Sequence, residues 1–257
     1  MDFSGKRVLI SDIINPICTE TAKLIKQKGG MVFVNANDKE AFLNSPAFLE
    51  NKDFFSGISI FGVNTSSESG AKNLVGEVIN IADKLDYFVH GGDFSLLAKM
   101  TLFDFDFALH KKIMDNFTKS AFFLGREAGE QIALQGGGAM VFLGSVHSEK
   151  PTGAVASLSM ASGAVKMMVK EMGLFFGRKK VRVNYLQIGA LEGDDDILES
   201  DISGIYYDYL TKTPYRRPGY PSEAASAAAA VLSDSFSLVN GADITVDGGF
   251  KLYYIDW

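Results

Sequence analysis

Short, continuously apolar segments alternate with longer segments of helical spacing along the whole chain. Apolar segments of this kind, separated by amphipathic ones, are typical of parallel strands that helices cover on both faces. We expect strands at 7–11, 31–35, 57–63, 86–89, 139–144, 181–187 and 243–246. We expect helices at 19–28, 66–84, 105–134, 154–176 and 222–232.

This alternation predicts an α/β fold with a doubly wound parallel sheet, Rossmann-like in architecture. At 257 residues, with no internal repeat or linker, the chain suits a single domain over 1–257. One segment, 191–220, departs from the alternation: it is acidic at its start and rich in Tyr, Arg and Pro at its end.

Composition narrows the environment and the partners. The net charge of -6 argues against nucleic acid, because phosphate binding needs clustered Lys and Arg. The single cysteine, Cys18, excludes an intramolecular disulfide and fits a reducing compartment. No apolar run approaches the ~20 residues that span a bilayer, and the N-terminus lacks a signal-peptide pattern. We therefore expect a cytoplasmic protein with no membrane contact and no metal site.

Four stretches in order carry a resemblance to a known family. They are Gly5-Lys6-Arg7-Val8-Leu9-Ile10, Leu143-Gly144-Ser145-Val146, Val181-Arg182-Val183-Asn184 and Val246-Asp247-Gly248-Gly249. At this spacing, over the whole chain, they resemble the short-chain dehydrogenase/reductase (SDR) family. The resemblance implies one Rossmann domain that binds a nicotinamide cofactor, with a variable substrate loop at 191–220.

The cofactor turn departs from the family pattern. The family carries T-G-x-x-x-G-x-G after its first strand, where glycines let backbone amides approach the pyrophosphate. The aligned residues 11–18 replace the three glycines by Asp12, Pro16 and Cys18. Asp12 adds a charge that repels a phosphate at ~4 Å by ~1 kcal/mol in water, and Pro16 removes an N–H donor. We therefore expect no cofactor in this chain.

The other cofactor positions have changed as well. Ala36 stands where NAD-selective members have an acidic residue, and Asn64 stands at the family's acidic adenine contact. The family's Asn-Asn-Ala-Gly aligns with residues 90–93, which begin with His90 and end with Asp93. We interpret His90 as structural, at a strand end, and Asp93 as a second charge near the altered turn.

The catalytic set is broken. Ser145 matches the family's serine and Asn116 its relay asparagine, but Leu158 and Ser162 occupy the positions of its Tyr and Lys. Leucine has no ionisable proton and cannot be a general acid or base. A Ser162–Lys166 pair one turn apart is the weaker alternative for a working dyad. We interpret Ser145 and Asn116 as residues that now bond locally.

Three functions remain open from these losses. The first is a non-catalytic subunit that supports an active NAD-dependent SDR alcohol dehydrogenase, with NAD bound in the partner and two copies of each chain. Its contacts would be the helices at 105–134 and 154–176 and the apolar tail 250–257. The second is a regulatory protein that binds a small ligand in the altered cleft, and the third is an oxidoreductase with atypical residues.

Two basic clusters bear on the substrate of such a complex. Residues 178–180 read Arg-Lys-Lys, and 216–217 read Arg-Arg, in an otherwise acidic chain. We interpret both as solvated surface, with contact to the phosphates of a CoA-thioester secondary alcohol as the alternative.

Overall fold

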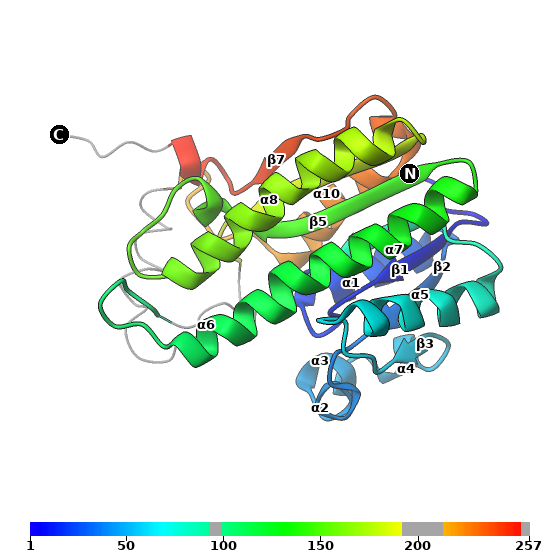
Figure 1. Ribbon diagram of the computed structural model, residues 1–257, viewed down its shortest axis with the longest axis horizontal. Coiled ribbons are helices and arrows are strands. Elements are labelled where there is room, and N and C mark those ends of the chain that lie inside the picture. Colours follow the sequence, from blue (N-terminus) through cyan, green and yellow to red (C-terminus); the bar gives the residue numbers. More distant parts are fainter. Residues whose placement is uncertain (93–98, 192–212, 253–257) are drawn as a thin grey trace.

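The computed structural model describes residues 1–92, 99–191 and 213–252, and these build one parallel sheet between two layers of helices (Figure 1). The sheet has seven strands in the order β3-β2-β1-β4-β5-β6-β7. The strands are β1 (Arg7–Ile10), β2 (Met31–Asn35), β3 (Ser59–Phe61), β4 (Tyr87–His90), β5 (Gly138–Ser145), β6 (Val181–Ile188) and β7 (Asp243–Val246).

The strand order reverses at β1, which pairs with β2 on one side and with β4 on the other. Val8 lies opposite Val32 in β2 and opposite Tyr87 in β4. In doubly wound sheets, ligands bind beyond the carboxyl ends of the strands at such a reversal. This topology puts the candidate site at the ends of β1 and β4.

Alternate residues of each strand face opposite helix layers. In β1, Val8 and Ile10 belong to one apolar cluster and Leu9 to the other. Helices α1 (Pro16–Gln27) and α10 (Pro221–Leu232) pack on the first face, while α5 (Glu68–Ala82), α7 (Ser120–Leu134) and α8 (Ala156–Gly177) cover the second (Figure 1). The expected α/β fold is thus confirmed.

The long helix expected at 105–134 is interrupted. The chain forms α6 (Phe107–Ile113), a π-helical turn at Met114–Lys119, and then α7. Asp106 sets the start of α6, because its Oδ1 accepts hydrogen bonds from the amides of Ala108 and Leu109. Apolar periodicity alone does not reveal a π turn, because it inserts extra backbone without a breaking residue.

The sequence pattern also missed three short helices between β2 and β3. They are α2 (Lys39–Leu43), α3 (Pro46–Leu49) and α4 (Lys52–Phe55). Asp38 and Ser45 cap the first two through their side chains. Phe42, Phe48 and Phe55 hold the three together, with ring centroids 5.3–5.6 Å apart. Helices this short show no apolar period, so only their caps could have revealed them.

Short 3₁₀ turns complete the described chain at Val146–Ser148, Asp234–Phe236 and Phe250–Leu252. Across the described ranges, no helix is both long and apolar enough to cross a bilayer. Asp93, most of the expected substrate loop and the last five residues of the tail lie outside the described residues.

Candidate functional site

The turn after β1 keeps the backbone conformation that suits a glycine, but the residue in it, Asp12, carries a carboxylate. Asp12 adopts a φ of 53°, in the left-handed region that glycine favours. Its side chain is buried, with Oδ2 accepting from Ser11 Oγ at 2.6 Å and from the Gly92 amide at 3.3 Å. Oδ1 accepts from Asn37 Nδ2 at 3.1 Å. The protein therefore satisfies this buried charge with its own donors.

The N-terminus of α1 is likewise occupied by its own side chain. Asn15 is the N-cap, and its Oδ1 accepts from the Ile17 amide at 2.9 Å. Its Nδ2 donates to the carbonyls of Gly91 and Gly92, each at 3.2 Å. Pro16 follows at the first helical position and has no N–H. With these groups in place, the turn does not fit a dinucleotide pyrophosphate, which needs free amides here.

The third replaced glycine, Cys18, fits because its neighbour has no side chain. A Cβ at Gly91 would overlap the Cys18 Sγ. Burial raises the pKa of the Cys18 thiol well above its usual range, and the Asp12 charge raises it further. A buried thiol of this kind is a poor nucleophile, so Cys18 serves as a packing residue.

His90 lies at the end of β4, fully buried between aromatic rings. Its ring stacks on Phe142 at 5.8 Å and meets Phe117 edge-on at 6.3 Å. Burial lowers the pKa of His90 to about 3, so the imidazole is neutral at physiological pH. This geometry supports the structural interpretation made from sequence.

An Asp, a His and a Ser meet at this point, but they do not form a nucleophilic triad. Nε2 of His90 lies 3.7 Å from Asp12 Oδ2 and 3.4 Å from Ser120 Oγ. A triad needs the acid and the nucleophile on opposite ring nitrogens, whereas one nitrogen faces both groups in this chain. All three side chains are also buried away from any substrate.

The two adenosine positions identified from sequence contribute little. Ala36 is buried and apolar, and Asn64 accepts from the Ser66 amide at 3.0 Å and from Ser66 Oγ at 2.7 Å. Their immediate neighbours Asn37 and Thr65 are the residues that reach the site. Sequence reasoning missed both, because polar residues after a strand are common and carry no spacing signal.

Two of the four expected catalytic positions, Ser145 and Ser162, form a structural contact. The Ser145 amide donates to Ser162 Oγ at 3.3 Å, and Ser145 Oγ accepts from the His147 amide at 3.2 Å. Ser162 is fully buried and Leu158 is nearly so. Asn116 lies in the π turn, half-buried. Ser145 thus bonds locally, as the sequence suggested.

A tyrosine that sequence reasoning missed fills the space beside Ser162. Tyr185, in β6, is fully buried, and its hydroxyl donates to the Ser162 carbonyl at 3.2 Å. A Cβ at Gly144 would overlap this hydroxyl. Burial raises the pKa of Tyr185 to about 12, which makes it a poor proton donor at neutral pH. A single aromatic residue in a buried strand was the only signal.

The alternative Ser162–Lys166 dyad is not formed. Lys166 pairs with Glu149, and its Nζ lies 3.3 Å from Asp243 Oδ2. Lys251, at the start of the tail, also pairs with Glu149. Hydrogen bonds from Lys166 and then Lys251 lower the pKa of Glu149 to about 2. These ion pairs fasten the tail's first residues to the loop after β5.

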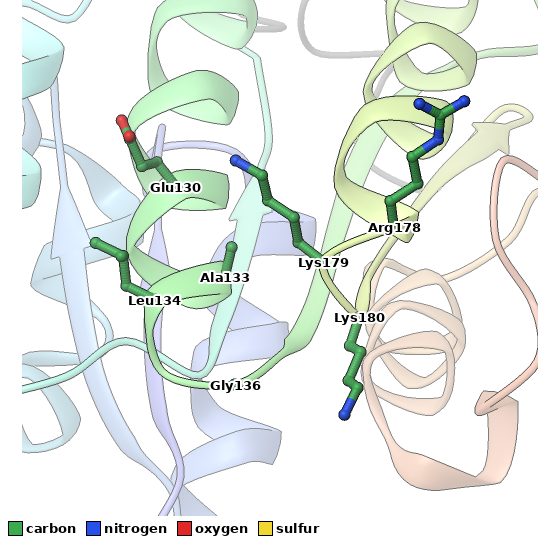
Figure 2. Close-up of a pocket in the computed structure, with 7 residues that line it drawn as sticks. All are labelled: Glu130, Ala133, Leu134, Gly136, Arg178, Lys179 and Lys180. Carbon is green, nitrogen blue, oxygen red and sulfur yellow. The ribbon is translucent and has the colours of Figure 1, made fainter.

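The basic clusters have structural partners. A surface hollow of about 380 Å³ lies between the ends of α7 and α8. Figure 2 shows that Arg178, Lys179, Lys180 and Glu130 are among the residues that line it. Cations at helix C-termini offset the helix dipole, and Lys179 Nζ lies 4.6 Å from the Phe175 ring centre.

In the second cluster, Arg217 forms an ion pair with Glu223 in the first turn of α10. It donates to both carboxylate oxygens of Glu223, at 2.8 and 2.7 Å. Both clusters therefore favour the solvated-surface interpretation. No group of His, Cys, Asp and Glu among residues 1–92, 99–191 and 213–252 is arranged to hold a metal ion.

Comparisons of the sequence place the chain among oxidoreductases. A family model described as enoyl-(acyl carrier protein) reductase matches residues 14–251. Glucose 1-dehydrogenase 2 of Bacillus subtilis is 25% identical over 98% of this chain and 97% of its own. The 7alpha-hydroxysteroid dehydrogenase of Escherichia coli is 26% identical over 96% of this chain and 85% of its own.

Solved structures share the fold. A gluconate 5-dehydrogenase from Burkholderia cenocepacia, in complex with NADP and tartrate, superposes with a TM-score of 0.86 at 21% identity, covering 98% of each chain. A 7 alpha-hydroxysteroid dehydrogenase with NADH and 7-oxo glycochenodeoxycholic acid gives 0.85 at 24% identity, covering 96% of this chain and 95% of that one.

Proposed function

The chain belongs to the short-chain dehydrogenase/reductase family, and on that premise we propose that it is a non-catalytic subunit that supports an active NAD-dependent member. The observation that carries the proposal is the altered cofactor turn. Asp12 and Asn15 fill with their own polar atoms the space where a dinucleotide would meet backbone amides. The partner subunit, in this proposal, binds the NAD.

The catalytic positions support the same proposal. Hydride transfer from an alcohol needs a base for the hydroxyl proton. Leu158 has no such group. The Ser162 hydroxyl accepts a hydrogen bond from the Ser145 amide, and the Tyr185 hydroxyl is buried and has a raised pKa. The relatives' names describe dehydrogenases, so the fold itself suits that chemistry, and the proposed loss lies in individual residues of this chain.

An exposed apolar face provides a surface for a partner. Met160, Met167 and Leu174 recur every seven residues on α8 and are 46%, 59% and 70% exposed. Phe122, on the neighbouring helix α7, is 47% exposed, and the two helices lie side by side (Figure 1). An exposed apolar stripe on α8, beside a helix that also exposes a phenylalanine, favours a subunit contact. Closed twofold symmetry makes two copies of each chain the simplest assembly.

We propose a CoA-thioester secondary alcohol as the substrate of the complex, in the cytoplasm. In its general pattern of losses, the chain is similar to the inactive subunit of 2-[hydroxy(phenyl)methyl]succinyl-CoA dehydrogenase, an enzyme of anaerobic toluene degradation. In such a complex, this chain would contribute structure and the partner would contribute the chemistry.

Co-expression tests the partnership. Each active SDR from the same genome is expressed with this chain carrying an affinity tag, and the eluate is sized and its subunits are quantified. We expect one homologue to elute with the chain in equal amounts and with NAD-dependent activity. A well-behaved monomer that retains none of these homologues would reject the subunit proposal and favour a ligand-binding regulator.

A further inference from the structure

The carboxylate of Asp12 is one member of a ring of polar side chains, in which hydrogen bonds join all neighbours except Asp12 and His90, whose Oδ2 and Nε2 atoms lie 3.7 Å apart. The other members are Asn37 after β2, Thr65 before α5, Ser120 at the start of α7, and His90 at the end of β4. Each comes from a different segment, and each is partly or fully withdrawn from solvent. The ring therefore ties together the carboxyl ends of β1, β2 and β4.

Hydrogen-bond chemistry fixes the direction of this ring. Asn37 Oδ1 must face Thr65, because it accepts from the Thr65 amide at 3.2 Å, and so its Nδ2 donates to Asp12. Thr65 Oγ1 donates to the same Asn37 oxygen at 3.0 Å. Because the Thr65 hydroxyl proton points to Asn37, Thr65 Oγ1 accepts a hydrogen bond from Ser120 Oγ, 2.7 Å away.

The direction of the ring determines the histidine tautomer. The Ser120 hydroxyl donates its proton to Thr65, so its oxygen accepts a hydrogen bond from the Nε2–H of His90, 3.4 Å away. Nδ1 of His90 has no hydrogen-bond partner among the described residues, which suits a lone pair rather than an N–H. Donation thus runs from a neutral imidazole through Ser120, Thr65 and Asn37 to the Asp12 carboxylate.

We propose that this ring, together with the Asn15 cap, is a built-in occupant of the cofactor cleft that holds the strand ends in place of a ligand. A dinucleotide at this edge would bridge the same strand ends and place negative charge at the same helix. In this chain the negative charge is the Asp12 carboxylate, and the helix amide is bound by Asn15 Oδ1. The strand ends are therefore joined at this edge by the chain's own side chains, without any nucleotide. The inference rests on the proposed non-catalytic function and explains how the cleft is closed.

Asp12→Gly tests the occupant, because glycine keeps the left-handed backbone and removes only the carboxylate. We expect the unfolding temperature of the full chain to fall by roughly 5–10 °C, since Asn37 Nδ2 and the Gly92 amide lose a buried acceptor. Asp83→Gly is the matched control: Asp83 has a φ of 66° at the end of α5 and is exposed. The unfolding temperature of Asp83→Gly should not fall, because glycine relieves backbone strain at this position. Equal stability of the two variants would overturn the proposal.

A second variant tests replacement by a ligand. Asp12→Gly combined with Asn15→Ala, Pro16→Gly and Cys18→Gly removes both parts of the occupant and restores the family's glycines, and its unfolding temperature should rise by about 3 °C or more in ~1 mM NADH. If this combined variant folds and its unfolding temperature does not respond to NADH, the proposal is also overturned. If it does not fold, the comparison of Asp12→Gly with Asp83→Gly decides. NADH binding by the unmodified chain would reject the proposed function instead, whatever the stability of the variants.

Discussion

Leu158→Tyr combined with Ser162→Lys is expected to give no dehydrogenase activity and a less stable protein. These substitutions restore the family's catalytic pair, but Ser162 is fully buried, with its hydroxyl and its carbonyl both bonded. A lysine ammonium at this position loses its water without gaining a carboxylate. Such burial costs about 3 kcal/mol or more, which lowers the unfolding temperature of a chain this size by roughly 6–12 °C.

Thermal unfolding measures the loss of stability, and the absorbance of NADH formed from NAD and secondary alcohols measures dehydrogenase activity. Ser162→Ala is the matched control, because it removes only the hydroxyl that accepts the Ser145 amide and should cost about 1 kcal/mol. Turnover by the double variant would mean that the altered turn still accepts NAD and that Asp12 does not exclude it.

Met167→Glu is expected to break the complex with the active partner. Met167 lies at the centre of the apolar stripe on α8 and is 59% exposed in the single chain. A carboxylate buried against a partner's apolar surface loses hydration without a compensating bond, so we expect at least tenfold weaker assembly. The partner's activity should fall with it, although no cofactor or substrate position is changed.

Ile81→Glu is the control for this surface. Ile81 is 60% exposed near the end of α5, away from α8, and should tolerate the same charge (Figure 1). Size-exclusion chromatography of the co-expressed pair, with the subunits quantified, distinguishes the two variants. An intact complex with Met167→Glu would place the partner on another face.

The sequence predicted the sheet well because most of its inner strands are buried on both faces. The segment 31–35 matches β2 in its bounds, since a continuous apolar run leaves little choice of structure. The segment 243–246 also matches β7, although that strand includes Asp243 and Thr245 and is only partly buried. The elements it missed are those without a period: α2, α3 and α4, and the π turn around Asn116. These depend on local caps and on packing between phenylalanines.

The candidate site was predictable only where a family pattern could be aligned. Asp12 and Ser162 were found because the family places glycine and lysine at those positions. Asn37, Thr65 and Ser120 were missed because the ring of polar side chains joins residues far apart in sequence, and each alone looks like an ordinary polar residue. Tyr185 was missed because an aromatic side chain in a buried strand most often only packs.

Calorimetric titration of the purified chain with NADH decides whether this chain has a working cofactor site. An active dehydrogenase of the family, measured under the same conditions, serves as the positive control. Because Asp12 and Asn15 fill the turn, we predict no binding heat for the chain up to ~1 mM NADH. This result would mean a dissociation constant above ~1 mM, which is a binding free energy weaker than about −4 kcal/mol. A dissociation constant in the micromolar range would contradict the loss of the site and restore the chain as an oxidoreductase in its own right.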